Sequence, residues 1–303
     1  MNNKRLSVCL TLLAASAMAL QACTPDVTDA PVADDTANAP AAPAREISNV
    51  TGDLYRVTDS AHRTVFLVTS EGIILADPIS VDFANWLKAE LASRYDVPVR
   101  FVLYSHYHDD HASGGDAFAD TATFVGHENM IPNLEAEAGN PVFANVRPPD
   151  VTFTDRMTVT LGGKTVEMLH ALPSHSDDSA IIRFPDERII FAVDFVNVRR
   201  VPFENLGGGP VAPWIAANHH MQETVDYDII APGHGPVGNR ADVDDSTRYL
   251  EVLLAEVTAG VEAGLSLEEL QETVLMEDFV DYIQYDVWRE MNVQGAYQGL
   301  MEN

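Results

Sequence analysis

Cysteine and basic residues are scarce in this chain of 303 residues. Its two cysteines, Cys9 and Cys23, are too few for a disulfide framework, and both lie close to the N-terminus. Only 18 lysines and arginines stand against 46 aspartates and glutamates, so the formal net charge is −28. Because binding to a phosphate backbone requires a basic surface, this charge excludes a nucleic-acid partner as a leading interpretation. We interpret the acidity itself as a solubility feature.

The N-terminus lacks an apolar run long enough to span a membrane comfortably. Lys4 and Arg5 precede an apolar core of 15 residues at 6–20, which is typical of an export signal. The sequence Leu-Gln-Ala-Cys that follows resembles the bacterial lipoprotein signal, in which cleavage precedes a cysteine that is then lipidated. We therefore expect a signal peptide at 1–22 and an exported protein on the periplasmic side, attached to a membrane only by a lipid on Cys23. A plain secretory signal with an incidental cysteine is the alternative, and either cleavage takes the net charge from −28 to −30.

Large apolar side chains are almost absent from residues 24–45, which are rich in alanine, proline, aspartate and threonine. Such a segment cannot bury enough apolar surface to offset the entropy lost on ordering. We expect residues 23–45 to comprise the lipidated cysteine and a disordered tether. No repeat or internal linker follows, so the sequence predicts one folded domain at 46–303.

Within this domain, short apolar runs and helical spacings alternate in two halves. Each half has strands followed by helices, a pattern that favours two packed sheets with helices outside them. Residues 127–150 are proline-rich and predict a flap or a short helix. The predicted strands lie at 54–57, 64–68, 72–76, 99–103, 122–125, 157–161, 165–169, 180–184, 188–192 and 228–231, and the predicted helices at 82–95, 213–224 and from 242 onward.

The stretch from His106 to His111 reads H-x-H-x-D-H and directly follows a predicted strand. Imidazole nitrogens and carboxylate oxygens are the ligands that zinc and similar metals accept. Gly114 and Gly115 would let the backbone turn back, so that the side chains converge. Three further candidates each follow a strand, and any one alone would more often be structural; they are His175, Asp194 and His234.

The order of these residues resembles the metallo-β-lactamase fold superfamily of hydrolases, over about residues 47–240. The resemblance implies an α/β fold, an αββα sandwich of two mixed sheets flanked by helices, with the metal site at one sheet edge. It also implies two Zn²⁺ per chain, although iron or manganese accepts the same ligands. The resemblance assigns His106, His108 and His175 to the first metal, Asp110, His111 and His234 to the second, and Asp194 to both.

The resemblance further predicts a hydrolase that attacks the carbonyl of a small molecule, such as an ester, lactone, thioester or amide. Two metals about 3.5–4 Å apart can share a hydroxide and polarise the substrate oxygen, and zinc lowers the pKa of its water to about 7. Asp110 would shuttle the proton, as its family counterparts are thought to do. Asp77 matches a family acid that supports the metal loop from behind it; a turn-forming aspartate before Pro78 is the alternative.

The sequence is compatible with several activities found within the superfamily. An aspartate at position 194 is more typical of glyoxalase II and lactonases than of true β-lactamases. The segments around His175 and at 292–297 are similar to an exported, sulfur-oxidation-associated metallohydrolase group. Glyoxalase II is disfavoured because it is cytosolic and carries a basic glutathione-binding region, whereas this C-terminus is acidic. A β-lactamase and a lactonase remain as alternatives, and a catalytically inactive metal-binding protein is the alternative from another class.

Two arginines follow Asp194 closely. Arg199 and Arg200 could hold a substrate carboxylate, and a pair of surface charges is the alternative. The remaining histidines match no ligand position and are interpreted as structural. They are His62, His127, His170, His219 and His220.

Overall fold

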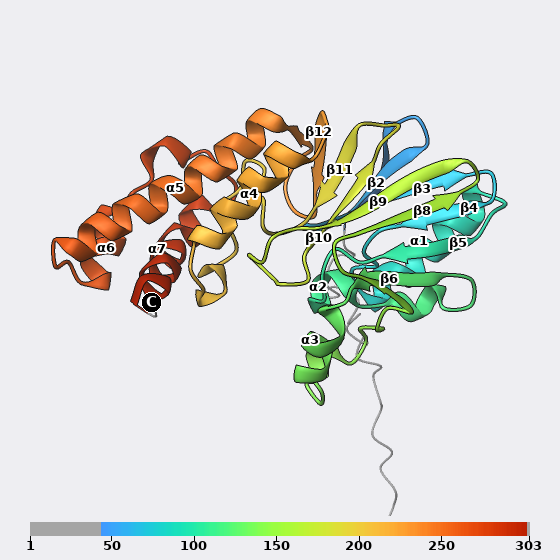
Figure 1. Ribbon diagram of the computed structural model, residues 1–303, viewed down its shortest axis with the longest axis horizontal. Helices are drawn as coiled ribbons and strands as arrows, with labels where there is room; N and C mark the ends of the chain where they lie inside the picture. Colours follow the sequence, from blue (N-terminus) through green and yellow to red (C-terminus); the bar gives the residue numbers. More distant parts are fainter. Residues whose placement is uncertain (1–43, 302–303) are drawn as a thin grey trace, which may run out of the picture. The chain divides into compact units, whose positions relative to one another are not determined.

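A computed structural model describes residues 44–301 of the chain (Figure 1). The predicted signal peptide, the predicted lipidation of Cys23 and the predicted tether up to residue 43 lie outside the described residues. Among residues 44–301, no helix combines the length and the apolar character that crossing a membrane requires.

The first sheet has seven strands, in the same order as in the sequence. The first four strands are antiparallel to one another, and the last four are parallel. The sheet is therefore mixed, as predicted. Its strands are β1 (Arg45–Thr51), β2 (Leu54–Asp59), β3 (His62–Thr69), β4 (Gly72–Leu75), β5 (Val99–Leu103), β6 (Thr123–His127) and β7 (Val151–Phe153).

The second sheet has six strands in the order β13-β12-β11-β10-β9-β8. Only β11 and β12 pair in parallel, and the other neighbours are antiparallel. Because β10 is antiparallel to both β9 and β11, strands β9, β11 and β12 run in one direction and end at one edge of the sheet. The bounds are β8 (Arg156–Leu161), β9 (Lys164–His170), β10 (Ala180–Phe184), β11 (Ile189–Ala192), β12 (Ile229–Pro232) and β13 (Gly238–Asn239).

Helices and short 3₁₀ turns connect and cover the sheets. The predicted helices are confirmed, and the 127–150 segment contains a short helix. The helices are α1 (Val81–Arg94), α2 (Asp109–Ala112), α3 (Met130–Ala136), α4 (Ala212–Thr224), α5 (Arg240–Glu262), α6 (Leu267–Thr273) and α7 (Tyr285–Met301), and the 3₁₀ turns are η2 (Gly115–Phe118), η3 (Pro141–Phe143), η4 (Leu206–Gly208) and η5 (Glu277–Phe279).

The apolar core has one layer between the two sheets and one layer outside each. Leu67 and Ile74 of the first sheet share the inner cluster with Val166 and Ile182 of the second. Phe83 and Leu87 of α1 cover the outer face of the first sheet, and α4 and α5 contribute side chains to the cluster outside the second. Burial of each such side chain contributes about 1.5–3 kcal/mol. This arrangement is the αββα sandwich that the sequence predicts.

Three strands are not predicted from the sequence, namely β1, β7 and β13. All three are sheet edges, and β7 and β13 have only three and two residues. These three strands bury few side chains and lack the alternation or apolar run by which the other ten strands, the edge strand β8 included, are recognised.

Candidate metal centre

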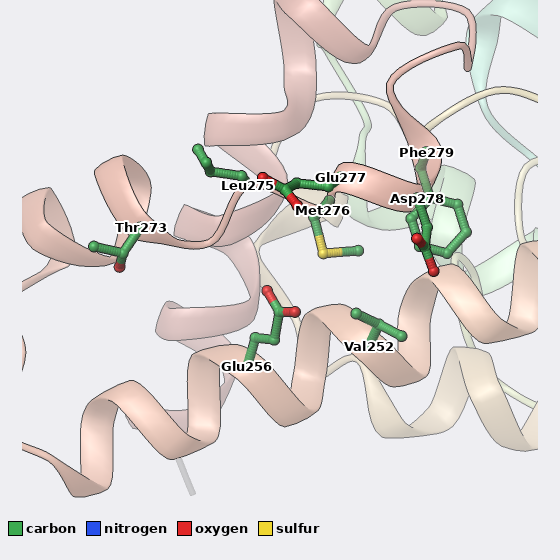
Figure 2. A pocket seen from close by; sticks show the side chains of 8 residues that line it. All are labelled: Val252, Glu256, Thr273, Leu275, Met276, Glu277, Asp278 and Phe279. Atoms are coloured by element: carbon green, nitrogen blue, oxygen red, sulfur yellow. The ribbon is translucent and has the colours of Figure 1, made fainter.

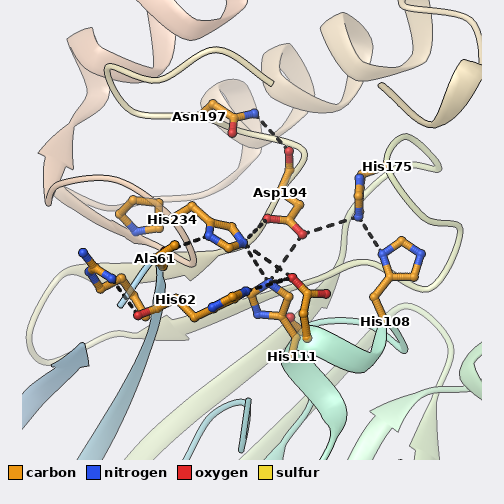
Figure 3. A network of polar contacts seen from close by, with 12 residues as sticks. Ala61, His62, His108, His111, His175, Asp194, Asn197 and His234 are labelled. Carbon is orange, nitrogen blue, oxygen red and sulfur yellow. Dashed lines mark hydrogen bonds and ion pairs between the residues drawn. The ribbon is translucent and has the colours of Figure 1, made fainter. Parts of the chain in front are cut away.

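Seven side chains gather where several strands end, and they form two groups that share Asp194. Figure 3 labels His108, His111, His175, Asp194 and His234 among them. Within each group, one ligand atom from every residue lies within 4.8 Å of the others. All seven predicted ligands are thus brought together, in the division that the resemblance implies. The first group is His106, His108, His175 and Asp194, and the second is Asp110, His111, Asp194 and His234.

Strand direction explains why residues so far apart in sequence meet. His175, Asp194 and His234 follow β9, β11 and β12, which end at one edge of the second sheet. The His106 loop follows β5, whose parallel neighbour β4 leads into Asp77. The two sheets face each other across the core, so both sets of strand ends supply side chains to one place.

The first group is closely packed. The Nε2 atom of His175 lies 2.8 Å from Nδ1 of His108 and 3.4 Å from Oδ2 of Asp194. Nε2 of His106 lies 3.6 Å from the same oxygen and, although buried, has no hydrogen-bond partner among the described residues. Leaving a buried polar nitrogen without a partner costs about 1–3 kcal/mol. A cation bound between these atoms would supply that partner, so the residues fit a metal.

The second group is arranged around His111. Its Nε2 atom lies 3.2 Å from Nε2 of His234, 3.5 Å from Oδ2 of Asp110 and 3.4 Å from Oδ2 of Asp194. The other carboxylate oxygen of Asp194, Oδ1, lies 3.3 Å from Nε2 of His234. Asp194 therefore faces both groups: its Oδ2 lies near histidine nitrogens of each group, and its Oδ1 lies near His234 of the second. A carboxylate in this position can be shared by two metals.

The electrostatics of both groups favour a cation. Burial lowers the pKa of His106 well below its usual value and lowers the pKa values of His108 and His234 to about 4, so these imidazoles are neutral, the form that binds metal. Burial opposes a charge on His111, but the carboxylates of Asp110 and Asp194 raise its pKa well above the usual value. The position between these two carboxylates therefore attracts positive charge.

A buried carboxylate supports the histidine loop from behind. Asp77 is fully buried; its Oδ1 accepts a hydrogen bond from Ser105 N (2.8 Å) and its Oδ2 from Ser105 Oγ (2.6 Å). Ser105 Oγ also lies 3.0 Å from Nδ1 of His106. Oδ2 of Asp77 lies 3.3 Å from Nδ1 of His111, in a contact that is not aligned as a full hydrogen bond. Ser105, which the motif does not single out, thus links Asp77 to a ligand histidine.

Residues with left-handed backbone conformations occur in the loops that carry the site. Gly114, predicted to turn the chain back, has φ 85°, and a Cβ there would lie 2.5 Å from the Ser80 carbonyl oxygen. Ile79 has φ 65° and donates its N–H to the His111 carbonyl at 2.8 Å. Asp194 itself has φ 64°. Left-handed conformations of residues other than glycine are strained and concentrate at functional sites, which agrees with this placement.

A cross-sheet contact fixes the loop that carries His234. Arg56 of β2 donates from Nη2 to the carbonyl oxygens of Pro232 (3.2 Å) and Gly235 (2.6 Å), on either side of His234. Nδ1 of His234 lies 2.9 Å from the carbonyl oxygen of Ala61, in the β2–β3 turn. These contacts orient the ring so that Nε2 faces the second group.

His62 lines the site, although it matches no ligand position in the motif. Its Nε2 atom lies 3.3 Å from Oδ2 of Asp110, and its ring centroid is 4.8 Å from that of His234. Two other histidines keep their structural interpretation: the rings of His127 and His170 stack on each other at 3.9 Å. The only sequence signal for His62 is its place directly after the β2–β3 turn.

We expect His62 to stabilise the conformation of Asp110 that binds metal. In the His62→Leu variant, the affinity of the protein for added zinc should fall about tenfold, because residues that hold metal ligands in place typically contribute 10–100-fold. Competition with a chromophoric chelator measures this change. His219→Leu, an exposed histidine paired with Glu251, serves as the matched control. Equal zinc affinity in the His62→Leu variant and the wild type would return His62 to a structural role.

A cavity of about 670 Å³ opens in front of the two groups. Trp214 forms part of its wall, with its ring 5.4 Å from that of His175. Arg200 also lines it, but Arg199 is not among the lining residues; Arg199 has φ 48° and its guanidinium lies 5.9 Å from the ring centroid of Tyr282. The predicted arginine pair is therefore divided, with one member at the site.

A smaller hollow of about 350 Å³ lies between α5 and the segment at 273–279 (Figure 2). Its polar side chains are mainly acidic, including Glu256, Glu277 and Asp278. No residue that lines it belongs to either metal-ligand group. The larger cavity is therefore the candidate substrate site.

Sequence comparison relates the chain to several enzymes. Residues 64–234 match the family model described as the Metallo-beta-lactamase superfamily. The chain is 23% identical over 288 residues to a linear primary-alkylsulfatase of a Pseudomonas species, a match that covers 76% of this chain and 54% of that protein. It is also 23% identical over 235 residues to the alpha subunit of a Nocardioides 2,4-dinitroanisole O-demethylase, covering 76% and 70% of the two chains.

Solved structures share the fold. A metallo-beta-lactamase from Pontibacter korlensis has a TM-score of 0.60 at 22% identity and covers 69% of this chain and 99% of its own. A stereoselective inverting sec-alkylsulfatase from a Pseudomonas species has a TM-score of 0.67 at 15% identity, covering 84% and 50%. This chain thus spans about half the length of the alkylsulfatases that it matches.

Proposed function

The chain belongs to the metallo-beta-lactamase superfamily, and on that premise we propose that it is a dinuclear zinc-dependent hydrolase of small-molecule carbonyl compounds. Esters, lactones, thioesters and amides are the substrates of this class. The observation that carries the proposal is the position of Asp194, whose carboxylate faces histidine nitrogens of both groups. Iron or manganese fits the same donor set as zinc.

Each side chain has a role in this proposal. His106, His108 and His175 would hold the first metal, Asp110, His111 and His234 the second, and Asp194 both. The bound metals would supply an activated water and polarise the substrate oxygen. Asp110 would hold or move a proton with the carboxylate oxygen that does not bind metal, while its Oδ2 faces His62. Asp77 and Ser105 keep the loop in place, and Trp214 excludes water from the His175 side.

Two alternatives within the fold are tested together with the main proposal. β-Lactamase and lactonase activities use the same donor set. A sulfate ester is the second candidate substrate, because alkylsulfatases match this chain over most of its length. Export, the periplasmic location and the lipid anchor on Cys23 stay predictions, since residues 1–43 lie outside the described part of the chain.

The test is the metal content of the purified protein, measured together with turnover. We expect two zinc ions per chain after reconstitution, and hydrolysis of at least one of four probes: a chromogenic cephalosporin, a lactone, a thioester and an alkyl sulfate. Asp110→Asn should abolish that hydrolysis. Two metals without turnover of any probe would support the inactive metal-binding alternative. Less than one metal per chain after reconstitution would overturn the assignment of the site.

A further inference from the structure

Arg200 is a buried cation without an anionic partner. Its side chain is 7% exposed, yet its guanidinium forms no hydrogen bond or ion pair with any residue of 44–301. The other described arginines without such a bond, Arg100, Arg156 and Arg199, are all exposed to solvent. Holding an unpaired charge away from water is costly, and buried charges are normally paired. Arg200 lines the cavity, so a ligand bound there can pair with its guanidinium.

The surroundings of Arg200 hold it beside the second metal group. Its Cβ lies next to Gly235, the neighbour of His234. Its guanidinium carbon lies 4.8 Å from the ring centroid of Trp288, within the range of a cation–π contact. Burial lowers the pKa of Arg200, while the charge of Asp194 raises it. The arginine therefore stays charged and is presented to the cavity by the tryptophan ring rather than by a carboxylate.

Bound metals would make the binding of an anionic ligand in the cavity more favourable. Two divalent ions bring four positive charges, of which the carboxylates Asp110 and Asp194 offset two. Arg200 then faces a centre of the same sign, and repulsion between them is relieved when the ligand carries negative charge.

The rest of the cavity wall combines apolar and aromatic side chains with polar ones. The polar residues there are His62, Asp109, Asn197, Asn205 and Gln284. Trp214 and Leu206 are buried in its wall, and Phe203, 56% exposed, lies against Trp288 with ring centroids 4.9 Å apart. With metals bound, the cavity would thus have a cationic side at Arg200 and the metal groups, and an apolar side at Trp214, Leu206 and Phe203. Its volume of about 670 Å³ is in the range of sites for drug-sized ligands.

We propose that the substrate is an amphiphilic anion, an ester whose negative group pairs with Arg200 while its hydrocarbon part lies on the apolar side of the cavity. This inference rests on the proposed function and narrows its substrate class. The anion is either the charge of a sulfate ester or a separate carboxylate on the molecule. A sulfate group and a carboxylate can each offer two oxygens to the guanidinium of Arg200, so the experiment has to distinguish the two anions.

Binding of a non-hydrolysable probe tests the arginine directly. Calorimetry with 1-octanesulfonate on the zinc-loaded protein should show affinity at least about tenfold lower in Arg200→Met than in the wild type, since a charge-assisted pair is lost. Arg200→Lys should lose less, because it retains the charge. Arg199→Met, the exposed neighbour, should bind like the wild type. Octyl methyl sulfone, the neutral counterpart, should bind equally to all four proteins. Equal binding of the sulfonate to the wild type and Arg200→Met would overturn the inference.

Turnover identifies the source of the anion. Octyl sulfate carries the charge at the scissile ester, monomethyl octanedioate carries it on a separate carboxylate, and methyl octanoate is the neutral control. One anionic ester should exceed methyl octanoate in kcat/KM by at least about tenfold, and Arg200→Met should remove that preference. If Arg200→Met lowers all three rates equally, the inference is wrong and the proposed hydrolase stands. If no ester is hydrolysed but sulfonate binding still depends on Arg200, the proposed function fails and the anion site remains.

Discussion

In the Asp194→Asn variant we expect the rate of hydrolysis to fall by at least about a thousandfold. Loss of a residue that only hydrogen-bonds to a metal ligand typically costs about 10–100-fold. The zinc content should fall below two per chain. Asp194 Oδ1 faces His234 at 3.3 Å and Oδ2 faces His175 at 3.4 Å. Asparagine keeps one carbonyl oxygen, replaces the other with an amide nitrogen that cannot bind metal, and removes the negative charge. Both metal positions therefore lose a ligand or a charge in one substitution.

Asparagine is also the substitution that disturbs the fold least. Asp194 has φ 64°, a left-handed conformation that asparagine adopts at least as readily as aspartate. Asp186→Asn, at a carboxylate that is 61% exposed, is the matched control and should keep wild-type zinc content and rate. An Asp194→Asn protein that binds two zinc ions and turns over within tenfold of the wild type would show that the two groups do not share this carboxylate.

The sequence predicts the packed sheets from local patterns, and it predicts the gathering of the seven side chains from the resemblance that their order carries. The ten recognised strands have apolar runs or alternation, and the candidate ligands follow strands that end at one edge of the sandwich. His175, Asp194 and His234 would each be unremarkable alone, and their order after the His106 loop is what carries the prediction. Their binding of metal stays a prediction until the zinc content is measured.

Residues placed by packing between distant elements could not be predicted. His62 reaches Asp110 only because the β2–β3 turn packs against the His234 loop, through the contact with Ala61. Trp288 reaches the cavity from α7, at the far end of the sequence. These positions follow from tertiary contacts that no short motif encodes.

The two adjacent arginines also could not be distinguished from the sequence. Arg199 and Arg200 are identical in type and adjacent in sequence, so composition cannot separate them. The left-handed backbone at Arg199 leaves that side chain exposed beside Tyr282, while Arg200 is buried in the wall of the cavity. The conformation of the loop decides which arginine lines the cavity.

The Asp77→Ala variant should lose stability and zinc affinity together. Removing this fully buried carboxylate leaves Ser105 N and Oγ without their acceptor and His111 Nδ1 without its anionic neighbour. Breaking one side of a buried charged pair typically costs about 3–5 kcal/mol, so the free energy of unfolding of the metal-free protein should fall by about that amount. Urea denaturation monitored by fluorescence measures the change, with Asp120→Ala at an exposed carboxylate as the control.

The Asp77→Asn variant distinguishes the role of Asp77 in zinc binding from its role in the stability of the fold. The amide oxygen can still accept from Ser105 N, so less stability should be lost than in Asp77→Ala. The amide NH₂ would face His111 Nδ1 as a donor, which favours the tautomer that carries its proton on Nε2, the nitrogen needed by the metal. Chelator competition should therefore show affinity for the second zinc about 10–100-fold lower than in the wild type. If both variants bind two zinc ions with wild-type affinity, Asp77 is only the residue that turns the chain before Pro78.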